Sequence, residues 1–460
     1  MKKLALLFTL LLSAFTLTAC LGGVGNEEVI LTIPNDLPNE PITIEFWHPF
    51  SQANQDLLEE MFESFREIYP QVTILQLNQG GYPQLRESTI QGIVSGITPT
   101  IVLGYPDHFV EYLNGRALVP LNEFIDHPVH GIDLDDFVAG FLAENQQYAD
   151  GLQYSLPFAK STEQVAYNKT FFDAQGITLD WRTPMTWAQI IELADVMVGD
   201  GPNQCPHLLN ADSPANLFIN SSRQWNAGYT NAAGEILVDN PETRAMLTFF
   251  QGLFEKNILA TPIEWDQRFG SGNFRAADVC MTQGSTAGTR HIVPREDDPF
   301  TDLGIIPVIQ YDLDNQSVMQ QGPNIAIMAN ATSNERLAAW LLLRHMTSTE
   351  NTAWFAMNTG YVPVRVSGFE DPEYQTFLQL VDRFEAGETL TVEERTRLPF
   401  AMAANIAYVQ VNAYGFDPAF VGRVTSSMAR RESEALIESI YAGTRTVEEA
   451  IQRMLNQLGQ

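Results

Sequence analysis

The side chains with the clearest chemical potential in this sequence are aromatic and polar residues that directly follow short apolar runs. Trp47 ends the first run, Tyr82 follows the second, and Tyr105 and Asp107 follow the third. Aromatic rings offer flat faces for stacking, and hydroxyl and carboxylate oxygens form hydrogen bonds with a polar solute. If the three runs are strands of one sheet, their ends form one side of a binding pocket.

The motifs of common catalytic and metal sites are missing. The sequence has no glycine-rich phosphate loop and no dinucleotide fingerprint, and its serines beside glycine do not form the Gly-x-Ser-x-Gly elbow of hydrolases. His127 and His130 lack the third ligand of a zinc site. Asp312 begins a loop that resembles a calcium site, but Ser317 and Pro323 stand where that loop needs Gly and Glu. We therefore expect no catalytic residue, no metal site and no cofactor.

The pocket residues need a framework, and the N-terminal part of the chain predicts a parallel α/β sheet. Apolar periodicity indicates strands at 42–47, 72–77 and 100–103, with helices at 54–69 and 85–94 between them. This βαβαβ order is typical of a parallel sheet. In open sheets of this kind ligands bind beyond the carboxyl ends of the strands, which is where Trp47, Tyr82 and Tyr105 stand.

A second series of strands and helices follows residue 157. Strands are expected at 165–167, 277–281, 304–308 and 325–328, and helices at 186–197, 242–255 and 334–357, the last broken near Thr347. Thr186 and Gln189 have the spacing of a capping box, and Thr446 and Glu449 repeat it before the last helix. The chain from about Tyr374 onward predicts mainly helix.

Composition excludes two broad classes of protein. The chain of 460 residues has 26 basic and 56 acidic side chains and a formal charge of −30, so it lacks the basic surface that nucleic-acid binding requires. With 45% apolar and only 18% charged residues, it is too hydrophobic to be disordered. The length predicts two or three compact bodies.

The first twenty residues predict export. Lys2 and Lys3 precede an apolar run that is too short to cross a membrane, which is the pattern of a signal peptide, here residues 1–19. The ending Leu17-Thr18-Ala19-Cys20 resembles the lipobox of bacterial lipoproteins, so we expect Cys20 to carry the lipid and to hold the protein outside the cell membrane. A plain secretory signal is the alternative. Residues 20–40 are rich in Gly, Asn and Pro and predict a flexible tether.

Cleavage of the signal peptide leaves Cys20, Cys205 and Cys280, and Cys20 is assigned to the lipid. Export exposes thiols to an oxidising compartment, so Cys205 and Cys280 are predicted to form a disulfide. Two buried free thiols are the alternative.

Six short segments, in order along the chain, resemble one protein family. They are Ile44–His48, Gly81–Gln84, Leu156–Phe158 with Val165–Lys169, Pro184–Trp187, Val279–Thr282 and Thr359–Pro363. Together they are similar to family 1 extracellular solute-binding proteins of bacterial ABC importers. The resemblance implies an α/β, two-lobed periplasmic-binding-protein-like fold of type II, with a hinge and a ligand cleft between the lobes. It also implies that the protein is not an enzyme and has an ABC permease as its partner.

The resemblance places the chain crossings between lobes near Pro157, Pro307 and Tyr361. The first lobe is then expected to comprise residues 40–157 and 307–360, and the second 158–306 and 361–460. Extended backbone suits such crossings, because a residue that precedes proline avoids the helical conformation.

The glycerol-3-phosphate-binding members of the family imply a set of ligand contacts. Position by position, these fall on Tyr82, Ser161, Ser285, Gly322, Tyr361 and Arg430. Two departures matter: the acidic contact expected after Tyr105 meets Pro106, with Asp107 adjacent, and two tryptophans of those proteins fall in residues 210–216, which contain none. A sugar is therefore an equal expectation, because Trp47 and Trp225 offer faces for stacking on a pyranose ring.

The sequence thus predicts a monomeric, lipid-anchored receptor. It captures a mono- or oligosaccharide, or a polyol phosphate such as glycerol 3-phosphate, by lobe closure and delivers it to the permease. One alternative is an exported hydrolase that acts on glycans through a pair of carboxylates. Another is a surface adhesion lipoprotein that recognises a polymer.

Overall fold

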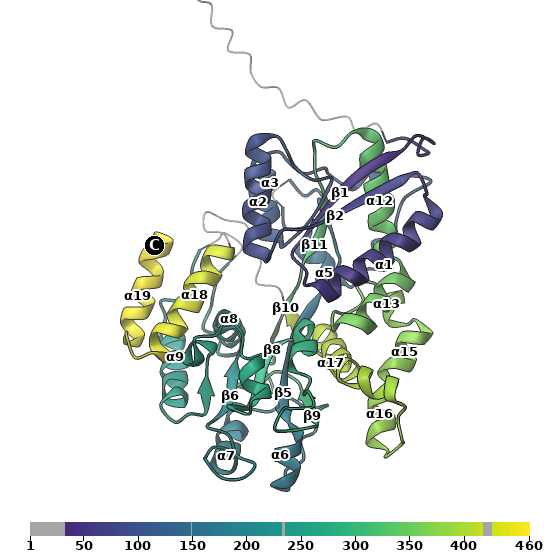
Figure 1. The fold of residues 1–460 in the computed structure, drawn as a ribbon. Helices are drawn as coiled ribbons and strands as arrows, with labels where there is room; N and C mark the ends of the chain where they lie inside the picture. The colour runs from purple at the N-terminus through teal and green to yellow at the C-terminus, as the bar shows by residue number, and fades with distance from the viewer. Residues whose placement is uncertain (1–32, 149, 232–234, 417–425) are drawn as a thin grey trace, which may run out of the picture. The chain divides into compact units, whose positions relative to one another are not determined.

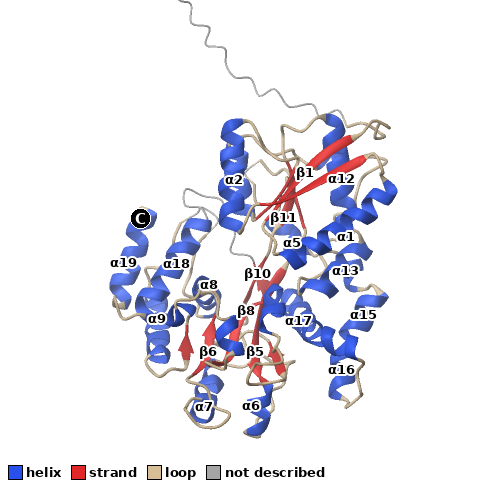
Figure 2. Ribbon diagram, in the orientation of Figure 1, coloured by secondary structure: helices blue, strands red, loops and turns tan. Residues whose placement is uncertain are grey.

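The computed structural model describes residues 33–148, 150–231, 235–416 and 426–460. The predicted signal peptide, the lipid-bearing Cys20 and most of the predicted tether lie outside these residues. Figure 1 shows the described chain and Figure 2 its helices and strands. Among the described residues, no helix combines the length and the apolar character needed to cross a membrane.

The first sheet has five strands in the order β2-β1-β3-β11-β4. They are β1 (Ile42–His48), β2 (Val72–Asn78), β3 (Ile101–Gly104), β4 (Ser155–Pro157) and β11 (Asn324–Ile327). β1 pairs in parallel with β2 and β3, so the predicted parallel βαβαβ unit is confirmed. β11 runs antiparallel between β3 and β4, so the complete sheet is mixed.

Helices flank the first sheet. They are α1 (Gln52–Ile68), α2 (Tyr82–Ser95), α3 (Pro106–Asn114), α4 (Asn122–Ile125), α5 (Ala139–Glu144), α12 (Ser333–Met346) and α13 (Thr349–Thr359). Alternate residues of β1 are buried, and Phe46 meets Phe62 of α1 edge to face with ring centroids 5.2 Å apart. In Figure 1, α1 and α12 lie on one side of the sheet, and α2 and α3 lie on the other.

The second sheet follows the order β12-β10-β5-β8-β6-β7, and β9 pairs with β5 beside this path. Its strands are β5 (Ser161–Asn168), β6 (His207–Ala211), β7 (Leu259–Ala260), β8 (Val279–Ser285), β9 (Leu303–Ile306), β10 (Val318–Gln321) and β12 (Gly415–Phe416). All eight residues of β5 are buried, as expected of a central strand. The sequence predicted only residues 165–167 of this strand.

The other helices of the described chain lie around the second sheet or in the C-terminal part of the chain. They are α6 (Lys169–Ala174), α7 (Trp187–Met197), α8 (Pro214–Gln224), α9 (Pro241–Phe254), α10 (Ser271–Arg275), α11 (Thr289–Ile292), α14 (Val366–Phe369), α15 (Pro372–Leu378), α16 (Leu380–Glu385), α17 (Val392–Tyr414), α18 (Ser426–Tyr441) and α19 (Val447–Leu458), with short 3-10 turns at Pro262–Trp265 and Thr286–Gly288. Both predicted capping boxes, at Thr186 and at Thr446, are confirmed.

A disulfide joins Cys205 and Cys280 in the second body of the fold, which is our name for the second sheet and the helices packed against it. Both sulfurs lie in the apolar core formed by α7, α9, β6 and β8, where Met197, Phe250 and Met281 are also buried. The bond closes a loop of 75 residues and connects the segment just before β6 to β8.

The passages between the two sheets meet around Lys160. The chain leaves β4 of the first sheet and enters β5 of the second through Phe158–Lys160, and it returns from β10 to β11 through Gly322 and Pro323. The sequence predicted that the chain returns to the first lobe near Pro307, but the strand order places the return between β10 and β11, downstream of that residue. The lobe boundaries themselves stay a prediction. The Lys160 carbonyl accepts from the N–H of Val362 at 2.9 Å, and its ammonium donates to the Gly322 carbonyl at 2.9 Å. A buried ion pair with Glu144 completes this junction.

Candidate functional site

Three tyrosines come together beside the first sheet. Tyr82 begins α2 after β2, Tyr105 caps α3 after β3, and Tyr361 follows α13. The rings of Tyr82 and Tyr105 lie with their centroids 4.6 Å apart. The hydroxyls of Tyr361 and Tyr105 lie near that of Tyr82 and contribute to its raised pKa. We call these three residues the tyrosine cluster. Tyr82 and Tyr105 were predicted because they follow parallel strands, and Tyr361 because of the family resemblance.

Burial keeps the tyrosine cluster protonated. It raises the pKa of Tyr82 well above the usual value and that of Tyr105 to about 12, although the positive charge of Arg430 opposes the second rise. Tyr361 is only 6% exposed, its ring stacks on Phe355, and burial raises its pKa also. At neutral pH the cluster therefore presents hydroxyl groups and ring faces rather than phenolates.

The predicted serines and glycine lie together in the second sheet and the adjoining passage. Ser161 begins β5 and Ser285 ends β8, the two strands pair antiparallel, and the Ser285 hydroxyl donates to that of Ser161 at 3.2 Å. Gly322 follows β10 with φ at +109°, and a Cβ there would lie 2.0 Å from the carbonyl oxygen of Ala159. Packing as well as backbone conformation therefore requires glycine at this position.

Arg430 of α18 extends toward both groups. Its Nη2 donates to the Asn216 side-chain oxygen on α8, and its Nη1 lies 3.7 Å from the Met319 sulfur. Its positive charge opposes the rise that burial causes in the pKa of Tyr105 and of Tyr229. We therefore treat the tyrosine cluster and Arg430 together as the candidate site.

Asp107 has a structural partner at this site. Its carboxylate accepts from the backbone N–H of Ser427 at 2.8 Å and from the Ser427 hydroxyl. Asp107 lies in the first turn of α3 and Ser427 in the first turn of α18, so this contact connects the two bodies of the fold. The sequence predicted Asp107 as an acceptor for ligand hydroxyls, and that role stays a prediction.

The two predicted tryptophans show no described bond or ring contact with this group. Trp225 follows α8, stacks on Tyr311 at 3.9 Å and packs against Phe249 and Phe250 in the second core. Trp47 lies on β1, and its indole N–H is buried without a partner among the described residues. No aromatic or hydrogen-bonding contact in the described structure joins either tryptophan to the tyrosine cluster or to Arg430. Their role in ligand binding stays a prediction.

Several residues at the site escaped the sequence analysis. They are Glu163, Asp212, Asn216, Gln283 and Ser427. Glu163 lies on β5 directly opposite Ser285, and Asn216 faces Arg430. Burial raises the pKa of Asp212 to about 6, although its carboxylate accepts from the Gly270 N–H. One signal was available: β5 begins Ser-Thr-Glu-Gln, an unusually polar start for a central strand.

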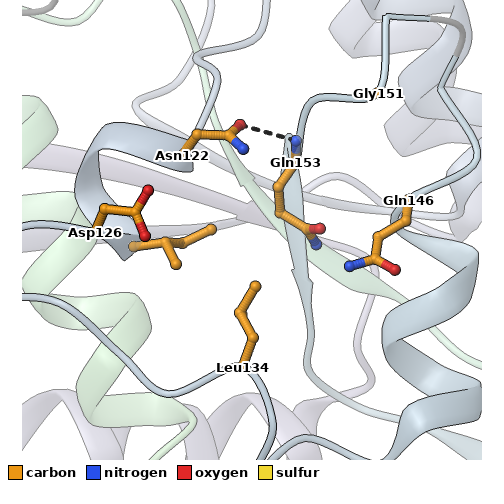
Figure 3. A pocket seen from close by; sticks show the side chains of 7 residues that line it. Asn122, Asp126, Leu134, Gln146, Gly151 and Gln153 are labelled. Carbon is orange, nitrogen blue, oxygen red and sulfur yellow. Dashed lines mark hydrogen bonds between the residues drawn. The ribbon is translucent and has the colours of Figure 1, made fainter.

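A cavity of 360 Å³ lies elsewhere in the fold (Figure 3). It is lined by Asn122, Ile125, Asp126, Leu134, Gln146, Gly151 and Gln153. Asn122 accepts from the Gln153 backbone N–H at 3.0 Å, while Asp126, Gln146 and Gly151 are exposed. The cavity includes none of the predicted site residues and opens to solvent, so we do not assign the ligand to it.

Comparison with known proteins identifies the family. A family model described as bacterial extracellular solute-binding protein matches residues 60–378, which is more than half of the chain. The chain belongs to this family. This is a family of extracellular solute-binding proteins rather than enzymes, so family membership argues against the hydrolase alternative and implies an extracytoplasmic location.

Individual relatives are distant. The sn-glycerol-3-phosphate-binding periplasmic protein UgpB of Shigella dysenteriae is 20% identical over 380 residues, which cover 80% of this solute-binding protein and 82% of the relative. UgpB of Rhizobium meliloti is 24% identical over 163 residues, which cover 35% of this chain and only 37% of the relative's length.

Solved structures show the same fold over most of the chain. UgpB from Mycobacterium tuberculosis in complex with glycerophosphocholine has a TM-score of 0.72 at 21% identity, covering 91% of this chain and 98% of that one. Maltose-bound MalE3 of T. maritima has a TM-score of 0.68 at 16% identity, covering 91% and 99%. The predicted two-lobed, type II periplasmic-binding-protein fold is thereby confirmed.

Proposed function

We propose that this solute-binding protein captures a hydroxyl-rich solute, either a saccharide or a glycerol phosphate ester, and delivers it to an ABC permease. The observation that carries the proposal is the meeting of the tyrosine cluster with Arg430. Tyrosine hydroxyls and the serine pair suit a polyol, and the guanidinium suits an anionic or strongly polar group. The similar structures support both ligand classes, because one holds glycerophosphocholine and another holds maltose.

The test is titration calorimetry of the purified protein with glycerol 3-phosphate, glycerophosphocholine, maltose and glucose. We expect saturable binding of at least one of these, in the micromolar range or tighter. Replacing Arg430 by Ala should abolish binding of the phosphate esters, because the guanidinium is the cation that we place beside the tyrosine cluster. Arg223→Ala on α8 serves as the control. If phosphate esters still bind to Arg430→Ala, Arg430 is not part of the site. If none of the four solutes binds to the wild-type protein, the proposed function is wrong.

We also propose that the protein is a monomer held to the membrane by lipid on Cys20, with residues 20–40 as its tether. The sequence Leu17–Cys20 carries this proposal. In a bacterial host fed a labelled fatty acid, the wild-type protein should be labelled and found in the membrane fraction. The Cys20→Ala protein should lose the label, and equal labelling of both would contradict the anchor.

A further inference from the structure

Glu163 is a buried carboxylate beside the proposed ligand site that has no role so far. It lies on β5, two residues after Ser161 and opposite Ser285, and it is 1% exposed. Successive residues of a strand face opposite sides, so Ser161 and Glu163 project from the same face of the sheet. A buried charge is costly unless it is fully hydrogen-bonded, so its partners decide whether the side chain is structural or part of the site.

Three side-chain amides hold the Glu163 carboxylate. Asn216 donates to Oε1 at 2.6 Å, and Asn220 and Gln283 donate to Oε2 at 2.7 Å and 3.1 Å. Asn216 and Asn220 are four residues apart on α8 and so lie on one face of that helix. The pKa of Glu163 is raised, because burial outweighs the amides of Asn216 and Gln283 and the charge of Arg430, which favour the ionised form. All three amides donate, and this is the arrangement that an ionised carboxylate requires.

Asn216 links this carboxylate to Arg430. Its Nδ2 donates to Glu163 at 2.6 Å and to the Gln321 side chain at 3.3 Å, which uses both of its hydrogens. The other polar atom of its side chain, Oδ1, then faces Arg430 and accepts from Nη2. An amide held in this way cannot rotate without breaking the bonds to Glu163 and Gln321. Glu163 therefore determines which end of Asn216 meets the guanidinium.

The same arrangement places a negative charge one side chain behind the guanidinium. A ligand charge bound beyond Arg430 would lie on the order of 10 Å from Glu163, and at an effective dielectric of about 20 two unit charges at this separation change a binding constant by roughly tenfold. A ligand that brings two negative charges to Arg430 is therefore also repelled by Glu163. A neutral solute loses nothing by this, and a singly charged phosphodiester is repelled less than a dianion.

Taking the proposed function as given, we propose that Glu163 is a positioning and specificity-determining residue of the cleft. Through Asn216 it orients Arg430 toward the tyrosine cluster, and its charge selects neutral and singly charged solutes over phosphate monoester dianions.

The positioning role is tested first without ligand. Arginine side chains are labelled with ¹⁵N, and the Arg430 guanidinium signals are assigned by their loss in Arg430→Lys. We expect the guanidinium to rotate slowly in the wild type and fast in Glu163→Gln. The introduced amide would place one of its N–H groups opposite the N–H of a neighbouring asparagine, so the amide network would no longer hold Asn216 in the orientation that accepts from Arg430. The double variant Glu163→Gln/Asn220→Asp restores an acceptor at position 220 and should recover slow rotation. Glu432→Gln is the matched control, since Glu432 is a buried carboxylate on α18 that pairs with Arg453.

Selectivity is tested with glycerol 3-phosphate at pH 8, glycerophosphocholine and maltose as probes. The measured quantity is the affinity for glycerol 3-phosphate divided by the affinity for glycerophosphocholine. This ratio should be about tenfold higher in Glu163→Gln than in the wild type, and the affinity for maltose should change least. Arg430 signals that are the same in the wild type and Glu163→Gln overturn the positioning role, and an unchanged affinity ratio overturns the selectivity. If no probe binds the wild type, the proposed function fails, whereas an Arg430 signal that still depends on Glu163 supports the positioning role.

Discussion

At the scale of single residues, environment decides chemistry more than residue type does. The site contains two carboxylates that the sequence could not tell from the other acidic residues: Glu163, held by three amides, and Asp212, which follows β6. Burial raises the pKa of Asp212 to about 6, and only the Gly270 N–H opposes that rise. The ionised form of Asp212 is therefore less stable in the folded protein than in the unfolded chain.

Asp212 should make stability depend on pH. The folded protein binds the Asp212 proton more tightly than the unfolded chain, whose pKa is about 4. The stabilisation is thus complete below about pH 4 and is lost as the pH rises to about 6. In Asp212→Asn the amide oxygen can still accept from the Gly270 N–H, but the side chain at position 212 no longer titrates. Relative to the wild type, its free energy of unfolding should rise by about 2 kcal/mol between pH 4 and pH 7, measured by urea unfolding. Asp195→Asn, an exposed substitution on α7, should show no such trend, and parallel curves for Asp212→Asn would contradict the prediction.

The sequence indicated the site unevenly, and the reason is physical. Tyr82 and Tyr105 were predictable because they follow parallel strands, and the ends of such strands share one edge. Arg430 and Ser161 required the family resemblance, since no local pattern marks them. Glu163 and Asn216 were missed because their importance comes from a contact between β5 and α8, which are distant in the chain. Trp225 was selected for its flat ring alone, and the structure packs that ring on Tyr311.

At the scale of elements, local signals predicted most of the fold. The break near Thr347 separates α12 from α13, and the Thr186 capping box begins α7 as expected. α3, β6, α8 and β10 were not predicted. β10 has four residues and α3 has nine, and elements of this length carry too little periodicity to stand out.

The passage after β10 depends on a single glycine. Gly322 has φ at +109°, and an added Cβ would lie 2.0 Å from the Ala159 carbonyl oxygen and 3.0 Å from the Lys160 Cα. Both are backbone atoms, so a rotamer change cannot relieve the overlap. Gly322→Ala should lower the free energy of unfolding by more than about 2 kcal/mol in urea. Gly288→Ala is the control, because its φ is −84° and its Cβ would meet open space. Equal unfolding midpoints for the two variants would show that the passage tolerates a side chain.

The disulfide should contribute substantially to the second body. It closes a 75-residue loop, and restricting a loop of this size in the unfolded chain is worth about 2 to 4 kcal/mol. Cys205→Ala/Cys280→Ala should lower the urea midpoint by the corresponding amount. A reducing agent should destabilise the wild type and leave the double variant unchanged. A reductant response that is the same in both proteins would contradict a structural role for the bond.

At the scale of the whole molecule, a few polar contacts connect the two sheets. Lys160 contacts Val362, Gly322 and Glu144, so its side chain and carbonyl tie together three segments of the passage region. Farther away, the Asp107 carboxylate bonds to the first turn of α18. The lobe assignment from sequence could not reveal these contacts, because both connect elements that are distant in the chain. If the two lobes close on a ligand, we expect these contacts to influence the balance between open and closed forms, which in turn sets the apparent affinity.

The contact between Asp107 and Ser427 should favour the closed form. A carboxylate at the N-terminus of a helix accepts charge-assisted bonds and interacts favourably with the helix dipole. Asp107→Ala removes this interaction and should raise the dissociation constant of the bound solute about tenfold. It should also enlarge the radius of gyration of the free protein in X-ray scattering. Ser427→Ala keeps the backbone N–H and loses only the hydroxyl, so its effect should be about threefold. If Asp107→Ala has the radius and affinity of the wild type, the contact does not govern closure, and Lys160 with Glu144 becomes the next pair to vary.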